Sequence, residues 1–233
     1  SAVVPSLIKS ITNKDYKMLK EKITSSVKLT MLIAIPCGMG LSVLADPVIE
    51  TFFGRLDIHE DTVLLMRLSV FVVVAYSYST ITNSVLQGID KMKLPVKHSA
   101  IALGIHVIVI TILLFMKTDV FGVALADIIF AVCVCVMNSR AIYNETGRKQ
   151  EIKYSFVLPF LASAIMGAVC AIVYYGLNAL TKAVAVPMFI AIAVAVIVYG
   201  VELVLFGVVD EVEIKSFPMG KKLVVLLKKI KLM

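Results

Sequence analysis

The side chains best suited to chemistry in this sequence are polar groups inside a long apolar run between positions 62 and 88. Five of them follow one another at spacings of seven, four, three and four residues: Ser69, Tyr76, Thr80, Asn83 and Gln87. These spacings put the five residues, called the polar stripe below, on one face of a helix. Polar groups are costly in lipid, so the stripe faces either another helix or a water-filled cavity. The amides and the phenol favour a cavity wall.

Two charged residues also lie inside apolar runs. Arg67 lies near the start of the same run, and Asp127 lies deeper within the stretch VALADIIFA. A long arginine side chain can reach the membrane surface from that position, whereas an aspartate is too short to do so. We expect Asp127 to form an ion pair with Arg67 from a neighbouring helix. Binding of a coupling cation or a proton is the alternative role for Asp127.

The stretch AIPCGMGLS combines a helix-breaking residue with two small ones, Pro36 followed by Gly38 and Gly40. Proline removes a backbone hydrogen bond and bends a helix, and the glycines allow close packing against a neighbour. The bend is either static or a hinge between two conformations, as in transporters.

No motif predicts catalysis. The sequence lacks a Walker loop, an H-E-x-x-H pair and a G-x-S-x-G elbow, and its three histidines are scattered. We therefore expect a protein that is not an enzyme and that holds no cofactor and no metal.

Composition shows which elements must position these residues. Of the 233 residues, 60% are hydrophobic and only 17% are charged, and the mean hydropathy is +0.96. Globular domains are about a quarter charged, so a bilayer must be the solvent here. Apolar runs long enough to cross about 30 Å of hydrocarbon as helices lie at 24–45, 62–88, 97–116, 120–142, 156–176 and 184–208, with a partial run at 1–11. The predicted fold is an all-α, polytopic membrane helix bundle.

The net charge of +7 follows from membrane topology rather than from a nucleic-acid partner. Of the 23 Lys and Arg residues, 19 lie in links on one side of the predicted spans, and only Arg55, Lys117 and Lys182 lie on the other. The side rich in Lys and Arg is cytoplasmic. We therefore expect a multi-pass protein of the cytoplasmic membrane with a cytoplasmic C-terminal tail, and no nucleic-acid binding.

Two further helices are predicted outside the spans. In ADPVIETFFG, Asp46 precedes Pro47 as an N-cap, and Phe52 and Phe53 suit the outer membrane surface. The tail GKKLVVLLKKIKLM puts lysines on one side and leucines on the other. Such a basic amphipathic helix lies on an anionic inner leaflet or packs on a partner protein.

Several stretches together resemble the C-terminal half of polysaccharide-exporter flippases: AIPCGMGLSVLADPVIETFFG, SVLQGIDKMKLP, VFGVALADI and EIKSFPMGKKLVVLLKKI. The branch that they resemble most is that of stage V sporulation protein B. Lipid II flippases and, more distantly, MATE exporters are related to it.

The resemblance implies the C-terminal lobe of a MATE-like, two-lobed transporter whose central cavity opens alternately to each side. Residues 1–142 would form part of the second lobe, 143–208 two additional spans, and 209–233 a cytoplasmic tail. The chain would then be a fragment, with the missing N-terminal lobe, membrane lipid and a lipid-linked saccharide as its partners. In lipid II flippases the last two helices help to form a groove for the lipid tail, and the spans 156–176 and 184–208 would do the same.

The function so implied is the transfer of a lipid-linked oligosaccharide or peptidoglycan precursor across the membrane by alternating access. A cation-coupled MATE-type multidrug exporter is one alternative, for which Asp127 is the candidate acidic residue, although the two additional helices argue against it. The other alternative is a non-transporting membrane scaffold whose basic tail recruits cell-wall enzymes.

Overall fold

The computed structural model describes residues 16–54, 60–147, 149 and 151–209. The elements in these ranges are all helical. They are α2 (Tyr16–Val43), α3 (Ala45–Phe53), α4 (Glu60–Gly88), α5 (Lys93–Phe115), α6 (Asp119–Thr146), the π-helical turn η1 (Lys153–Val157), α7 (Leu158–Thr181) and α8 (Ala185–Leu205).

Six of these helices are long and apolar enough to cross a membrane, and each matches a predicted span. This confirms the all-α membrane bundle. α2 begins at Tyr16, earlier than the predicted apolar run, because the polar stretch YKMLKEK continues the helix beyond the part that hydropathy marks. α6 likewise runs on to Thr146 and ends at Gly147, whose φ is +63°. The predicted partial run 1–11 and the basic tail lie outside the described residues.

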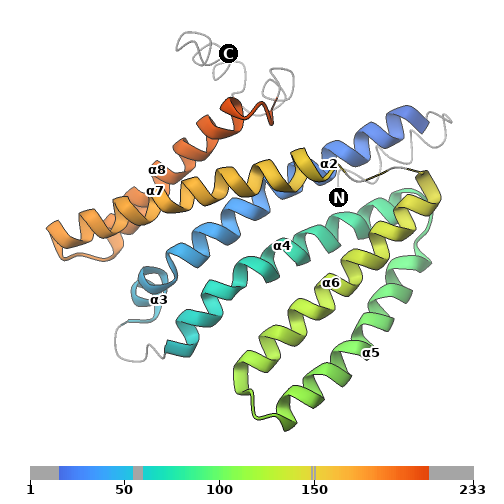
Figure 1. Ribbon diagram of the computed structural model, residues 1–233, viewed down its shortest axis with the longest axis horizontal. Helices are drawn as coiled ribbons and strands as arrows, with labels where there is room; N and C mark the ends of the chain where they lie inside the picture. Colours follow the sequence, from blue (N-terminus) through green and yellow to red (C-terminus); the bar gives the residue numbers. More distant parts are fainter. Residues whose placement is uncertain (1–15, 55–59, 148, 150, 210–233) are drawn as a thin grey trace.

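The six long helices lie side by side in the order α5, α6, α4, α2, α7, α8 (Figure 1). This order differs from the order in the sequence, because α4 packs mainly on α2 and α6 rather than on α5, which follows it in the chain. α2 lies in the middle, with α4 on one side and α7 on the other. The short helix α3 contacts α2, α4 and α8 at the end of the bundle that the charge distribution places outside.

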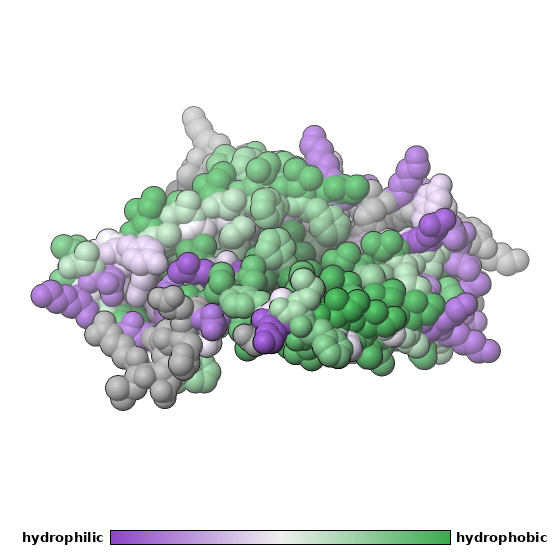
Figure 2. All heavy atoms as spheres, turned by 60° about the horizontal axis from the view of Figure 1, so that its bottom comes forward, coloured by the Kyte–Doolittle hydropathy of each residue, from purple (hydrophilic) through white to green (hydrophobic). Residues whose placement is uncertain are grey.

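The surface has the distribution expected of a membrane protein. In Figure 2, hydrophobic side chains cover the middle of the visible face, and hydrophilic ones gather mainly at its two ends. Large apolar side chains are exposed along α5 in particular, among them Leu103, Val107, Ile108 and Phe115. In water such a surface would be unstable, whereas in a bilayer it contacts lipid or other spans.

Gly38 brings α2 and α4 into close contact. A Cβ atom at this position would lie 3.1 Å from the Cα of Val70 on α4. The close packing predicted from the glycine is therefore found at Gly38. It is not found at Gly40, where a Cβ would meet no described atom within 4 Å.

The start of α3 corrects one detail of the prediction. α3 begins at Ala45, and its N-cap residue is Leu44, which makes no side-chain capping bond. Asp46 is thus inside the first turn and not the N-cap, because its carboxylate is bonded to Arg67 on α4. Phe52 and Phe53 are exposed, as expected at a membrane surface.

We predict that Gly38→Ala destabilises the bundle, because the added methyl group meets the backbone of Val70 and must push α4 away. Overpacking of this kind costs about 1–3 kcal/mol. Gly104→Ala on α5 is the matched control, since its Cβ meets no described atom within 4 Å. Thermal denaturation in detergent should show a lower midpoint for Gly38→Ala and an equal or higher one for Gly104→Ala. Equal midpoints for the two variants would contradict the contact.

Candidate functional site

An apolar groove of about 540 Å³ lies between α2, α3, α7 and α8. We call it the tail groove. Its walls are almost entirely hydrocarbon and include Ile33, Pro36 and Gly40 of α2, Met166 of α7, and Val196 and Tyr199 of α8. Gly40, which makes no close helix contact, therefore leaves space in this groove. A groove of this size and polarity suits a hydrocarbon chain and not a sugar or a nucleotide.

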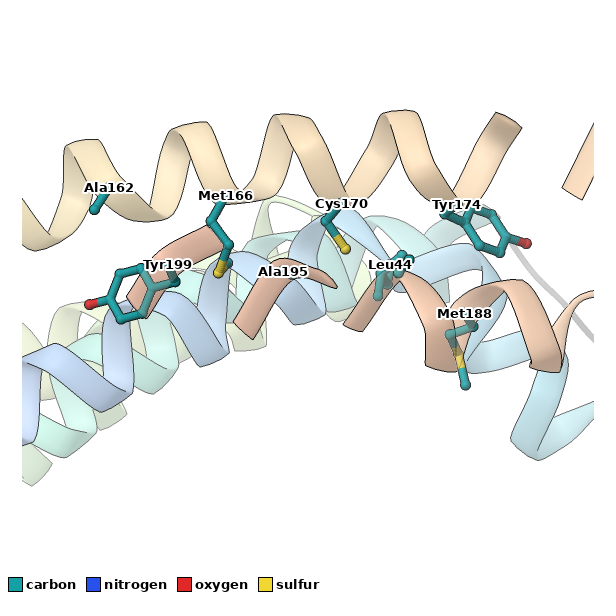
Figure 3. Close-up of a cluster of buried hydrophobic side chains, with 9 residues drawn as sticks. Leu44, Ala162, Met166, Cys170, Tyr174, Met188, Ala195 and Tyr199 are labelled. Atoms are coloured by element: carbon teal, nitrogen blue, oxygen red, sulfur yellow. The ribbon is translucent and has the colours of Figure 1, made fainter. Parts of the chain in front are cut away.

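The contact between α7 and α8 forms the back of the tail groove. Figure 3 shows Ala162, Met166, Cys170 and Tyr174 of α7 facing α8 along one stripe. α8 contributes Met188, Ala191, Ala195 and Tyr199 to the same buried cluster. Small residues at such a contact let two helices in a membrane approach closely. The hairpin α7–α8 is thus a closely packed wall of the groove.

Tyr199 also completes the hydrogen bonding of the proline turn in α2. A proline at position 36 has no N–H to donate to the carbonyl of Leu32, four residues earlier. The hydroxyl of Tyr199 donates to that carbonyl over 2.9 Å. Tyr199 is buried and lines the tail groove. One residue of α8 therefore stabilises the proline turn and contacts whatever occupies the groove.

A second polar feature lies between α4, α5 and α6 near their lysine-rich ends. The amide nitrogen of Asn138 donates to Thr82 Oγ1 over 3.0 Å and to Asn83 Oδ1 over 2.7 Å. Its oxygen lies 2.8 Å from Nδ1 of His98. Asn138 and Thr82 are fully buried, and His98 is 8% exposed. This buried network links three helices and was not predicted from the sequence, where Asn138 stands alone at the end of an apolar run.

The members of the polar stripe have different environments. Asn83 takes the helix-contact role through its bond to Asn138. Tyr76, Thr80 and Gln87 are exposed on α4, and Thr80 donates to the carbonyl of Tyr76 within its own helix. The buried hydroxyl of Ser69 has no hydrogen-bond partner among the described residues. A cavity wall along the exposed members remains a prediction.

The expected ion pair between Arg67 and Asp127 is wrong. Arg67 donates to Asp46 Oδ2 over 2.7 Å, which ties α4 to α3 near the outer surface. Asp127 lies instead 3.8 Å from Nδ1 of His106 on α5. The cause is the packing direction, since Arg67 points towards α3 whereas Asp127 faces α5. Both partners, Asp46 and His106, lie on elements whose position relative to Arg67 and Asp127 the sequence did not reveal.

Asp127 belongs to a small cluster inside the membrane. The ring of His106 packs edge-on against Phe130, with centroids 5.9 Å apart, and Phe130 lies 6.2 Å from the ring of Tyr76. The carboxylate of Asp127 is 42% exposed. An exposed carboxylate deep in a span is costly against lipid, so this face of α5 and α6 needs water, a cation or another polar element of the protein.

Together, the six membrane-length helices define a polytopic helical membrane protein with an apolar groove between its spans. The family described as lipid II flippase MurJ matches residues 1–196. The chain belongs to this family, which confirms the resemblance to lipid flippases seen in the sequence.

Two proteins of Bacillus subtilis (strain 168) show the relation. The chain is 26% identical to "Lipid II flippase MurJ" over 181 residues, which are 76% of this chain and 32% of that protein. It is also 26% identical to "Uncharacterized membrane protein YabM" over 230 residues, 96% of this chain and 42% of that protein. The chain thus spans less than half the length of either relative. No solved structure matches it.

We predict that Tyr199→Phe destabilises the protein by about 1 kcal/mol, because the carbonyl of Leu32 loses its partner while the apolar packing is kept. Tyr175→Phe is the matched control, since Tyr175 is an exposed tyrosine of the same hairpin whose ring contact with Tyr174 survives the change. Denaturation midpoints in detergent measure both variants. A Tyr199→Phe midpoint equal to that of Tyr175→Phe would show that the bond contributes nothing.

Proposed function

We propose that the protein takes part in moving a lipid-linked cell-wall precursor, an oligosaccharide or a peptidoglycan intermediate, across the cytoplasmic membrane by alternating access. The observation that carries this proposal is the tail groove between α2, α7 and α8. Its hydrocarbon walls suit the lipid tail of such a cargo, and membership of the lipid II flippase family supports the same use. The name of the first relative makes a peptidoglycan precursor the first cargo to test.

The polar headgroup of the cargo needs a different surface. We propose that the exposed part of the polar stripe, Tyr76, Thr80 and Gln87, belongs to the wall of a central cavity in the complete transporter. A second lobe from the rest of a longer protein would form the opposite wall. If the headgroup binds along α4 and the lipid tail binds in the tail groove, one face of α4 should be polar and the tail groove apolar, as they are.

In the same proposal α2 acts as a hinge. Pro36 has no N–H to hold the backbone of the preceding turn, so the carbonyl of Leu32 depends on Tyr199 for its hydrogen bond. Gly38 holds α2 against α4 at almost the same level. Bending at this point would change the angle of α7 and α8 to the other helices, and with it the width of the tail groove.

The tail groove is tested with Gly40→Leu. A Cβ atom added at this position meets no described atom within 4 Å, and Gly40 lines the groove. The larger leucine side chain would therefore take up part of the space proposed for the lipid tail. We expect the rate of transport of a fluorescent lipid-linked precursor in proteoliposomes to fall about tenfold or more. The added side chain excludes part of the lipid tail, and a loss of about 1.4 kcal/mol in binding free energy corresponds to tenfold weaker binding.

Gly200→Leu is the matched control for this experiment. Gly200 lies on α8, is exposed, does not line the tail groove and also has open space around its Cβ position. The change in helix propensity is the same for both variants. If both variants transport like the wild type, the groove does not hold the lipid tail. If the wild-type protein itself does not move the precursor, a scaffold without transport activity becomes the better interpretation.

Coupling to a cation is a second candidate property, favoured by the Asp127–His106 pair inside the membrane. We predict that Asp127→Asn abolishes stimulation of transport by a proton or sodium gradient while it leaves transport without a gradient nearly unchanged. The reason is that an amide binds neither a proton nor a cation as a carboxylate does. Asp90→Asn, the same change in an exposed link between α4 and α5, is the control. Unchanged gradient dependence in Asp127→Asn would leave Asp127 a purely structural role.

A further inference from the structure

A second groove, of about 330 Å³, lies between the beginning of α5 and the end of α6. We call it the inner groove, because it lies at the lysine-rich end that the charge distribution places at the cytoplasmic surface. In Figure 1 this is the region where α4 and α6 end and α5 begins. In contrast to the tail groove, it combines apolar and polar walls: Leu94 and His98 of α5, and Met137, Arg140, Asn144 and Glu145 of α6.

The charges in the inner groove leave one cation without a partner. The carboxylate of Glu145 is paired with Lys91 at 3.0 Å, so these two charges balance. Arg140 is exposed and forms no ion pair or hydrogen bond with any residue that the structure describes. A guanidinium binds a phosphate with two parallel hydrogen bonds. The inner groove therefore offers one unbalanced positive charge with the geometry that a single phosphate group requires.

His98 contributes a hydrogen-bond acceptor beside this cation. Both donors of the Asn138 amide are used by Thr82 and Asn83, so its oxygen must accept from His98. In the neutral imidazole this puts the proton on Nδ1 and leaves the lone pair on Nε2 for a ligand. Because the network buries His98 and fixes its ring, this acceptor is preorganised. With the amide of Asn144, the inner groove can thus receive hydroxyl groups next to a phosphate.

An apolar stripe leads from the inner groove into the membrane. Ile101 and Ile105 follow Leu94 and His98 at seven-residue spacing and are exposed on α5. On a helix this spacing keeps them on nearly the same face. A ligand with its phosphate at Arg140 could therefore lay a hydrocarbon chain along α5.

We propose that the inner groove binds the headgroup of one anionic glycerophospholipid of the phosphatidylglycerol type from the inner leaflet. The phosphodiester binds Arg140, the glycerol hydroxyls bind Nε2 of His98 and Asn144, and the acyl chains follow Ile101 and Ile105. The single unbalanced cation matches the single charge of a phosphodiester. The ammonium group of phosphatidylethanolamine would need a free carboxylate, but the carboxylate of Glu145 is already paired with Lys91. A pyrophosphate would need a second unpaired cation in the groove. The proposal does not depend on the transported cargo.

The test measures lipid binding to the full-length protein in nanodiscs of phosphatidylcholine, with phosphatidylglycerol added in steps and bound lipid counted by native mass spectrometry. We expect Arg140→Gln to weaken binding about tenfold, because a charge-assisted hydrogen bond is lost. Lys97→Gln is the matched control, since Lys97 is an exposed cation on α5, next to His98 in the sequence, that does not line the groove. We expect it to weaken binding about twofold or less. Arg140→Lys should restore part of the loss, and Asn144→Leu should reproduce it without a change in charge.

Three results would overturn the proposal. Equal weakening by Arg140→Gln and Lys97→Gln would show that only the general positive charge of this surface attracts the lipid. Binding of phosphatidylethanolamine as tight as that of phosphatidylglycerol would show that the groove does not select the anionic headgroup. Displacement of phosphatidylglycerol by a polyprenyl pyrophosphate, in parallel with loss of transport in Arg140→Gln, would assign the groove to the cargo. Transport that fails while phosphatidylglycerol binding persists would count against the proposed function alone.

Discussion

Little water is available within a bilayer, so a polar group in a span is costly unless the protein supplies a hydrogen-bond partner. This constraint determines how the helices of this chain pair. The buried amide of Asn138 fixes α4, α5 and α6 against one another, and the hydroxyl of Tyr199 fixes α8 against α2. The many apolar contacts would tolerate several arrangements, because lipid chains are as apolar as leucine. A few polar contacts therefore select one arrangement among them.

The bond between Tyr199 and Leu32 connects the tail groove to the shape of α2. Pro36 creates the free carbonyl, and a residue from the opposite wall of the groove occupies it. In the proposed function, a hydrocarbon chain in the groove contacts Tyr199, and bending of α2 moves or breaks the hydrogen bond to Leu32. Under this proposal, occupancy of the groove and bending of α2 would both act on the hydrogen bond between Tyr199 and Leu32. This is the kind of two-state element through which binding can drive a conformational change.

The sequence was sufficient to locate the membrane spans but not to determine which spans pack against one another. Membrane thickness sets the length of an apolar helix, so the six spans could be located from hydropathy. The order of the helices has no such signal. We paired Arg67 with Asp127 because both lie inside spans, but Asp46 and His106 are their partners. Asn138 was missed because a single amide near the end of a run looks like a surface residue until Thr82, Asn83 and His98 are placed around it. Gly38 and Gly40 look alike in the sequence, and only the position of α4 separates a packing residue from a groove residue.

The packing of the helices also suggests where the proposed hinge motion would occur. α7 and α8 contact the rest of the described chain mainly through α2 and α3, whereas α4, α5 and α6 are joined by the Asn138 network. The bundle therefore has two groups of helices with α2 between them. Pro36, Gly38 and the bond to Tyr199 all lie in the C-terminal half of α2. In the proposed hinge motion, a bend there would change the angle between the two groups. The Asn138 network would keep one group intact, and the buried apolar contact between α7 and α8 the other. The hydrogen bond from Tyr199 of α8 to the carbonyl of Leu32 reaches this part of α2, so such a movement would strain it.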